Sequence, residues 1–249
     1  MASIKAENLC LHYPLEVKPR DVAENAQLPE NIVRVGSRYF VLALNHLNFH
    51  FKQGQRIGLI GRNGSGKSTL LRALGGIYAP TSGVLQTEGQ VSSLFNINLG
   101  IQPDASGREN IFIRCLLKGW SRREIAERIP EIVEYSDLQD VIDLPLRTYS
   151  DGMRMRLLFA IATTASPEIL LLDEWIGAGD ANFRKKATAR MNSLVDKAGI
   201  TVIASHNRGL LRQVCDLGMW LHNGKMRAFG PIEDIYEMHD EANQKNGRA

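Results

Sequence analysis

Residues 61–69 read Gly-Arg-Asn-Gly-Ser-Gly-Lys-Ser-Thr, which matches the Walker A phosphate-binding pattern G-x-x-x-x-G-K-[ST]. Glycines keep side chains out of such a loop, so that its backbone N–H groups can surround a phosphate. Lys67 supplies a cation for the β- and γ-phosphates, and Ser68 offers a hydroxyl to Mg²⁺. A predicted buried strand (56–60) and a predicted helix (68–74) flank the loop, and the N-terminus of that helix favours negative charge. The expected nucleotide-binding residues are Gly61, Arg62, Asn63, Gly64, Ser65, Gly66, Lys67, Ser68 and Thr69.

Candidate catalytic side chains follow two further predicted strands. The apolar run 169–172 is typical of a strand buried on both faces of a parallel sheet, and it ends in Asp173 and Glu174. Neighbouring strand residues point to opposite faces, but both can reach a crevice at the carboxyl end of the strand. Asp173 is expected to hold Mg²⁺ through water, and Glu174 to orient or deprotonate the attacking water. His206 follows the predicted strand 201–205, where its imidazole can contact the γ-phosphate.

A second potential phosphate site lies at the start of a predicted helix, 152–164. Ser150 and Gly152 present a hydroxyl and bare backbone at this helix N-terminus. One nucleotide does not need two phosphate sites from one chain. A head-to-tail dimer is the economical arrangement, with Ser150 of one copy closing over the phosphates held by Lys67 of the other. Taken from the phosphate loop and the two strand ends, the predicted catalytic residues are Lys67, Glu174 and His206.

The elements that must position these residues form an α/β pattern with a helical insertion. Strands are predicted at 4–11 and within 39–51, with two short ones in 84–94 and a hairpin around Asn223-Gly224. Helices are predicted at 108–117, after Ser121 with its capping-box partner Glu124, at 183–195 and at 232–239. Residues 14–38 lack clear periodicity and are interpreted as an irregular insertion, and 243–249 as a disordered tail.

Composition narrows the class of protein. The net charge of +3 over 249 residues is too small to indicate nucleic-acid binding by itself. Cys10, Cys115 and Cys215 are far apart and form no C-x-x-C pair, which favours buried thiols in a reducing compartment. The sequence opens without an apolar signal region, and no run approaches the roughly 18–20 apolar residues that span a bilayer. We therefore expect a protein that reaches a membrane only through a partner.

These motifs, in this order, resemble the nucleotide-binding subunit of ABC transporters over nearly the whole chain. The resemblance implies one ATP-binding domain over 1–249, with the α/β fold of a P-loop NTPase. That fold has a RecA-like core, an antiparallel β subdomain and a helical subdomain, here inserted over 103–150. By the same resemblance, 150–153 is the signature motif, 177–180 is the D-loop with Asp180 at the nucleotide, and His206 is the switch histidine. The implied cofactors are ATP and Mg²⁺.

Three features depart from the family pattern or leave a choice open. Asp151 stands where the signature motif usually has Gly or Ser, and its carboxylate should repel a γ-phosphate unless it points away. The Q-loop residue, a ligand of the metal site, falls on Asn96, with Gln102 as the alternative. The aromatic residue that stacks on adenine is Tyr13 or Tyr39. Tyr13 is favoured because it follows the first predicted strand.

Finer motifs resemble the polysaccharide-export branch of the family. They are Tyr-Ser-x-Gly-Met at 149–153, x-Gly-Asp in the D-loop, and Gly-Arg-Glu-Asn at 107–110. The resemblance implies a homodimer bound to two copies of a polytopic permease at the cytoplasmic face of the inner membrane. Its cargo would be a lipid-linked glycan such as O-antigen, capsule, teichoic acid or mycobacterial galactan, with no role for nucleic acid. The helical insertion, 103–143, is the expected docking surface for the permease.

Two other classes compete with this hypothesis. The alternative function is a soluble ABC ATPase that is not coupled to a transporter. DNA-repair relatives of that kind carry a long coiled coil, and translation relatives carry two cassettes in one chain, whereas this sequence has neither sustained heptads nor a second cassette. An unrelated phosphate-loop kinase would leave the motif at 149–153 and His206 unexplained.

Overall fold

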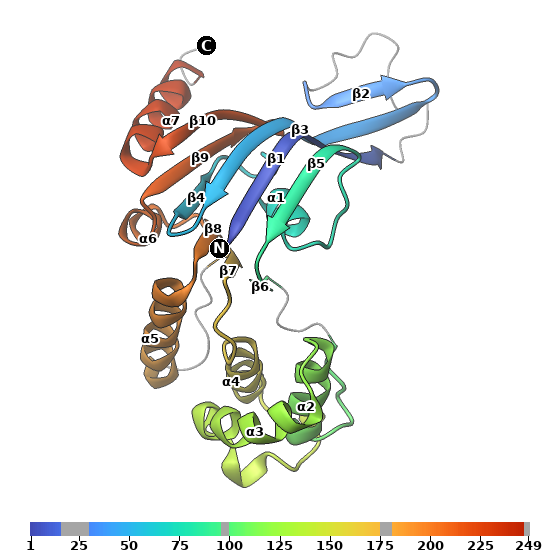
Figure 1. Ribbon diagram of the computed structural model, residues 1–249, viewed down its shortest axis with the longest axis vertical. Coiled ribbons are helices and arrows are strands. Elements are labelled where there is room, and N and C mark those ends of the chain that lie inside the picture. Colours follow the sequence, from blue (N-terminus) through green and yellow to red (C-terminus); the bar gives the residue numbers. More distant parts are fainter. Residues whose placement is uncertain (16–29, 96–99, 175–180, 247–249) are drawn as a thin grey trace. The chain divides into compact units, whose positions relative to one another are not determined.

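The computed structural model describes two compact units of the chain (Figure 1). The first comprises residues 1–93, 168–174 and 198–249, and the second comprises 94–167 and 175–197. Within these units the described residues are 1–15, 30–95, 100–174 and 181–246. In that described part, no helix has both the length and the apolar character needed to cross a bilayer.

A six-stranded sheet forms the centre of the first unit, in the order β10-β9-β4-β8-β7-β6. Its strands are β4 (Arg56–Ile60), β6 (Val91–Ser93), β7 (Ile169–Asp173), β8 (Ile200–Ala204), β9 (Leu217–His222) and β10 (Lys225–Pro231). The strands from β9 to β6 run parallel, and only β10 pairs antiparallel. Because helices and a second sheet cover this sheet, β8 is buried throughout and β7 up to Asp173. The predicted α/β core is confirmed.

An antiparallel sheet in the order β2-β3-β1-β5 completes the strands of the first unit. It contains β1 (Ser3–Leu15), β2 (Ile32–Val35), β3 (Arg38–Lys52) and β5 (Ser82–Glu88). The expectation of an irregular insertion over 14–38 is wrong for 14–15, which end β1 and pair with β3. It is also wrong for 32–35, because these residues pair with β3 across a tight turn at Gly36, whose φ is 61°. Residues 16–29 of that insertion lie outside the described part of the chain.

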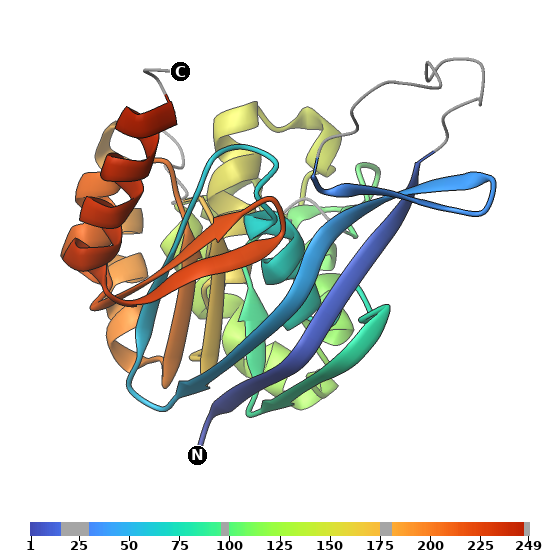
Figure 2. The same cartoon turned by 90° about the horizontal axis from the view of Figure 1, so that it is seen from above.

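In the described part of the first unit, three helices pack on the sheets. Helix α1 (Lys67–Leu74) contacts β7 and β8 of the parallel sheet and β3 of the antiparallel sheet, so it lies between the two sheets (Figure 2). Helix α7 (Ile232–Asn246) packs against β9, β10 and β4. It runs past Asn243, so the predicted disordered tail is wrong for 243–246, and 247–249 lie outside the described residues. Helix α6 (Arg208–Val214) was not predicted.

Four helices and two 3-10 turns make up the described part of the second unit. They are α2 (Gly107–Leu117), α3 (Arg122–Ser136), η1 (Gln139–Val141), η2 (Leu146–Thr148), α4 (Asp151–Ala162) and α5 (Ala181–Lys197). The capping box of Ser121 and Glu124 at α3 is confirmed, and Ser106 and Glu109 form another at α2. A core that includes Ile111, Ile125 and Leu157 holds α2, α3 and α4 together. Residues 103–150 lie within this unit, alongside α4 and α5.

Candidate functional site

The predicted phosphate loop, Asp173, Glu174 and His206 line one hollow of about 370 Å³ in the first unit. We call it the loop hollow, and residues 63–69 form much of its wall. Asp173 and Glu174 reach it from the carboxyl end of β7, and His206 from just beyond the carboxyl end of β8. Because β7 and β8 pair in parallel with Asp173 opposite Ala204, these ends lie side by side. Gly61 and Arg62 are part of the same turn but do not line the hollow.

Two glycines are required by the close approach of other backbone segments. Gly66 caps the N-terminus of α1 at a φ of 109°, and a Cβ there would lie 2.6 Å from the carbonyl oxygen of Ala43. Gly61 has a φ of 152°, and a Cβ there would collide with the carbonyl oxygen of Leu221. The turn from β4 into α1 therefore excludes side chains at both positions, and it leaves backbone facing the hollow.

Lys67 crosses the base of the turn from the first residue of α1. Its Nζ donates to the carbonyl oxygens of Gly61, at 2.7 Å, and Arg62, at 3.1 Å. Burial lowers the pKa of the ammonium, while the nearby carboxylates of Asp173 and Glu174 act in the opposite direction. The cation is thus held at the loop by backbone oxygens and faces two carboxylates.

The chemistry of the loop hollow fits a phosphate chain and Mg²⁺. Among the described residues, the buried hydroxyl of Ser65 has no hydrogen-bond partner, although buried hydroxyls are normally paired. A phosphate oxygen would satisfy it. Ser68 Oγ donates to Asp173 Oδ1 at 3.2 Å, which brings together a hydroxyl and a carboxylate. Mg²⁺ prefers such oxygen ligands and usually combines one or two carboxylates with substrate phosphates.

Glu174 occupies an unusual backbone conformation at the end of β7. Its φ is 71°, in the left-handed region that residues other than glycine seldom adopt. Its N–H donates to the carbonyl oxygen of Ala204 at 2.8 Å. The carboxylate accepts one hydrogen bond from Ser205 Oγ, at 2.9 Å, and another from the backbone N–H of His206, at 3.1 Å. Three contacts therefore fix Glu174 to the end of β8.

Ser205 belongs to the site, although the sequence pattern indicates only that it ends a strand. Its hydroxyl contacts Glu174 and also accepts from the N–H of Asn207 at 3.2 Å. Asn207 in turn caps α6 by accepting from the N–H of Leu210 at 3.1 Å. A hydroxyl residue directly before the predicted switch histidine was the available signal. The His206 side chain remains exposed at the rim, with Nε2 3.9 Å from Glu174 Oε1.

The two candidate aromatic residues occupy different places. Tyr13 lines the loop hollow and packs edge-to-face against Tyr78, with ring centroids 5.7 Å apart. Burial raises the pKa of its phenol. Tyr39 is buried away from the lining, with the guanidinium of Arg34 5.9 Å from its ring centroid. Tyr13 is therefore the aromatic side chain that the fold brings to the hollow.

The signature-like segment belongs to the second unit. Ser150 is the N-cap of α4, and its hydroxyl accepts from the N–H of Met153 at 3.2 Å. Gly152 lies in the first turn of α4, where an added Cβ would meet nothing closer than 4.0 Å. The Asp151 side chain is fully exposed and lies 3.6 Å from the guanidinium of Arg154. Its carboxylate thus points into solvent, where a cation partly offsets its charge.

The Gly-Arg-Glu-Asn segment at 107–110 fixes the loop that leads into α2. Arg108 makes a bidentate ion pair with Asp143. Fully buried Asn110 accepts from the N–H of Gln102 and donates to the carbonyl oxygens of Gln102, Ala105 and Ser106. These contacts give the motif a structural role. Of the two candidate Q-loop residues, Asn96 lies outside the described residues, as do the predicted D-loop and its Asp180.

A family model described as "ABC transporter" matches residues 44–177 of the chain. An O-antigen export system ATP-binding protein, RfbB of Myxococcus xanthus, is 43% identical over 81% of this chain and 46% of its own length. The O-antigen export system ATP-binding protein RfbE of Yersinia enterocolitica is 42% identical over 90% of this chain and 96% of its own length. The teichoic acids export ATP-binding protein TagH of Shouchella clausii is 38% identical over 80% of this chain and 55% of its own length. The chain thus spans about half the length of two of these relatives and nearly all of the third.

Solved structures share the fold. An ATP-binding subunit of an ABC transporter superposes with a TM-score of 0.68 at 21% identity, over 95% of this chain and 93% of that one. A dimeric ATP-binding cassette in a post-hydrolysis state, bound to ADP and Pi, gives a TM-score of 0.65 at 19% identity, over 92% and 98%. The family model covers more than half of the chain, and the Yersinia protein is matched over almost its full length. The chain therefore belongs to the ABC transporter family, as one of its ATP-binding ATPase subunits.

Proposed function

We propose that this ATPase drives an exporter that moves a lipid-linked polysaccharide, such as an O-antigen, capsule or cell-wall glycan, across the cytoplasmic membrane. The observation that carries the cargo class is the nearly full-length match to the O-antigen export protein of Yersinia enterocolitica. The match to a teichoic acid export protein supports the broader class of cell-surface glycans. The same proposal makes 1–249 one ATP-binding domain, with an inserted helical subdomain over 103–150.

ATP is proposed to bind in the loop hollow. Backbone of 61–69 and the ammonium of Lys67 would hold the phosphates, and Tyr13 would stack on adenine. Ser68 and Asp173, whose side chains lie 3.2 Å apart, would hold Mg²⁺. When bound there, Mg²⁺ would neutralise part of the phosphate charge. Asn96 or Gln102 would complete the metal site.

Hydrolysis is proposed to use Glu174 as the base that orients and deprotonates water. Each carboxylate oxygen of Glu174 accepts one hydrogen bond, from Ser205 or His206, and each keeps a further lone pair for a proton. His206 is proposed to contact the γ-phosphate through its exposed imidazole. Loss of that contact after hydrolysis would report the change of nucleotide to the rest of the subunit.

A head-to-tail dimer is proposed to complete each site. Ser150 and Gly152, at the N-terminus of α4, would face the phosphates held by Lys67 of a second copy. Asp180 is proposed to lie at the same interface. The Arg154 guanidinium, 3.6 Å from the Asp151 carboxylate, supports this arrangement, because the cation offsets part of the charge that would repel the phosphates.

The permease is proposed to dock on the second unit and to hold the ATPase at the cytoplasmic face of the inner membrane. A hollow of about 360 Å³ is lined by Ile101, Pro103, Leu146, Arg147 and Arg154. Leu116, Leu117 and Leu144 of the same unit are large apolar side chains left exposed. Such apolar surface is typical of a protein interface.

The test is to purify the chain gently from detergent-solubilised native membranes and to identify its partners by mass spectrometry. A polytopic membrane protein recovered in equal amount would support the exporter, and glycan analysis of a deletion strain would then name the cargo. Recovery of soluble partners alone would favour a soluble ABC ATPase. Transfer of phosphate to an acceptor other than water would favour a kinase.

A further inference from the structure

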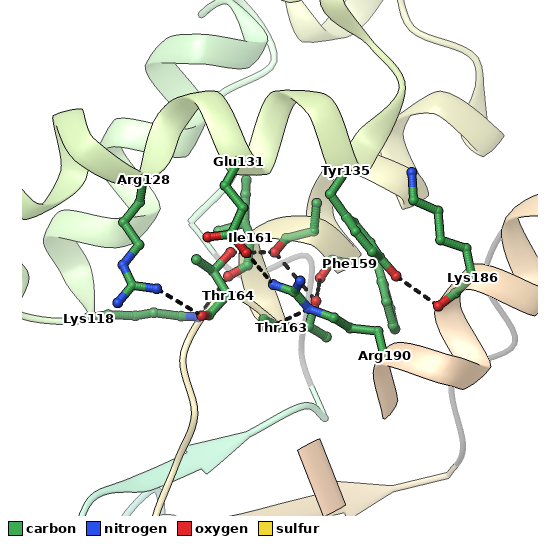
Figure 3. A network of polar contacts seen from close by, with 11 residues as sticks. Lys118, Arg128, Glu131, Tyr135, Phe159, Ile161, Thr163, Thr164, Lys186 and Arg190 are labelled. Atoms are coloured by element: carbon green, nitrogen blue, oxygen red, sulfur yellow. Dashed lines mark hydrogen bonds and ion pairs between the residues drawn. The ribbon is translucent and has the colours of Figure 1, made fainter. Parts of the chain in front are cut away.

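The C-terminal end of α4, in the second unit, is surrounded by cations (Figure 3). Lys118 Nζ donates to the carbonyl oxygens of Ile161, at 3.0 Å, and Ala162, at 3.2 Å. Arg190 Nε donates to the carbonyl oxygen of Thr163 at 3.2 Å, and Arg128 approaches that of Thr164 at 3.4 Å. A helix C-terminus carries only about half a negative charge, so this end has more positive charge than capping requires.

A hollow of about 230 Å³ lies beside this helix end, and we call it the cationic hollow. Three cationic residues line it, whereas Glu131 is the one carboxylate in its lining within the described part of the chain. The other lining residues are hydroxyl-bearing, apart from Leu194. The lining consists of Arg128, Glu131, Thr163, Thr164, Ser166, Arg190, Ser193, Leu194 and Lys197. This composition suits a small anion and offers little to an apolar ligand.

Aromatic rings hold both guanidinium groups in place. Arg128 lies over Trp120, 5.3 Å from the ring centroid, and Arg190 lies over Tyr135 at 4.8 Å. Stacking of this kind orients a guanidinium at little entropic cost. Each guanidinium has five N–H donors, and the contacts of Arg190 use its Nε, with Thr163, and one terminal nitrogen, with Glu131 at 3.0 Å. The remaining N–H groups can bind oxygen atoms in the hollow.

The chemistry of the lining favours phosphate over other anions. The planar guanidinium group of arginine can donate paired hydrogen bonds to two oxygen atoms of a phosphate. Lys197 adds a point charge, and the hydroxyls of Ser166 and Ser193 can donate to further oxygens. The hydroxyls of Thr163 and Thr164 already donate to helix carbonyls, so they leave the donor role to these other groups.

We propose that the cationic hollow binds a compact phosphate-bearing anion of pyrophosphate type, at a site separate from the loop hollow. The two hollows share no lining residue and belong to different units. A soluble phosphate compound and a phosphorylated lipid headgroup present the same chemistry to Arg128, Arg190 and Lys197. The proposal does not depend on the cargo proposed above.

Isothermal titration calorimetry with inorganic pyrophosphate tests this site. The background is Lys67→Ala in Mg²⁺-free buffer, so that the phosphate loop contributes little. One equivalent of pyrophosphate should bind, and Arg128→Gln or Lys197→Gln should each weaken binding about tenfold, as expected for loss of one charged hydrogen bond. Arg123→Gln is the matched control, since it removes the same charge from the same helix at a side chain that is 89% exposed and pairs with Glu127. It should leave the affinity unchanged.

Three results would overturn the proposal: no binding, binding insensitive to both variants, or an equal loss in Arg123→Gln. Arg190→Gln is a poor test because it would also leave the Glu131 carboxylate of the lining without its ion pair to Arg190. Circular dichroism checks that the variants fold, and the Lys197 side chain is exposed, so its replacement should disturb the fold little. Flotation with phosphatidylcholine vesicles that contain phosphatidic acid distinguishes a lipid headgroup from a soluble phosphate compound as the source of the anion. Arg128- and Lys197-dependent flotation assigns the site to a lipid headgroup, and pyrophosphate binding without flotation assigns it to a soluble compound.

Discussion

Replacing Ser205 by alanine is expected to slow ATP hydrolysis without weakening ATP binding. Ser205 Oγ donates to Glu174 Oε2 at 2.9 Å, and the N–H of His206 holds the other oxygen at 3.1 Å. The Glu174 carboxylate lies close enough to Lys67 to raise the pKa of that ammonium against the effect of burial. Glu174 and Lys67 line the same loop hollow, and the Ser205 hydroxyl holds the Glu174 carboxylate there.

The size of the effect follows from the exposure of this contact. A hydrogen bond to a charged group contributes about 1.5–3 kcal/mol, and solvent screening reduces that value. The Glu174 side chain is 54% exposed. We therefore expect Ser205→Ala to raise the activation free energy by about 1 kcal/mol, because Glu174 is less well oriented. This corresponds to an about fivefold lower kcat. Ser205→Thr keeps the hydroxyl and should restore most of the rate.

The assay is phosphate release at saturating ATP–Mg²⁺, with KM for ATP measured in parallel. A fall in kcat at constant KM is the signature of an interaction that acts on the reaction and not on ATP binding. The control is a double-mutant cycle with Glu174→Gln. In that background Ser205→Ala should have no further effect, since the base that it positions is gone. An unchanged or higher kcat, or the same fall in the Glu174→Gln background, would refute the positioning role.

Three further predictions concern the base, a buried lysine and the phosphate loop. Glu174→Gln removes the base, so kcat should fall by about 100-fold or more. Size-exclusion chromatography with ATP should show a stable dimer, and normal turnover would exclude Glu174 as the base. Burial lowers the pKa of Lys118 from 10.5 to about 8, so between these pH values the unfolded chain binds more protons than the folded chain. Lys118 should then contribute a rise of up to about 1.4 kcal/mol per pH unit to the free energy of unfolding in urea, measured as the difference between the unchanged protein and Lys118→Met, and an equal pH dependence in the two proteins would contradict this. Gly61→Ala puts a Cβ against the Leu221 carbonyl, so it should lower the free energy of unfolding by about 3 kcal/mol and also impair ATP binding. Thermal melts measure the loss of stability. Gly64→Ala, whose Cβ would meet nothing within 4 Å, should lose less stability than Gly61→Ala, and equal losses would argue against the collision.

The parts of the fold that the sequence predicted well are those where one local rule dominates. The run 169–172 is apolar and 201–204 is rich in apolar residues, which is typical of central strands, and Asn223-Gly224 supplied both positive φ values of the β9–β10 turn. The Walker A spacing fixed the β4–α1 turn for the same reason. At these places the residue types leave few conformations open.

The parts that were missed depend on contacts made across the fold. Strand β2 has only half-buried and exposed residues, so it shows no apolar alternation, and pairing with β3 defines it. Helix α6 is too short for a clear periodicity, and its arginines are held by α7. Arg208 pairs with Asp240, Arg212 pairs with Glu233, and both lie over the Tyr236 ring. Contacts with a helix that lies further along the chain cannot be predicted from the short stretch of sequence around α6.

Glu174 shows most clearly which features cannot be predicted from a sequence. Strand alternation alone would send Glu174 and Asp173 to opposite faces, although both can reach the crevice at the end of the strand. The φ of 71° turns Glu174 toward the end of β8, where it forms hydrogen bonds with Ala204, Ser205 and His206. A left-handed residue other than glycine costs of order 1–3 kcal/mol, and glycine would remove that cost. Since glycine carries no carboxylate, the strained backbone at this position is itself an argument that the Glu174 side chain has a chemical role.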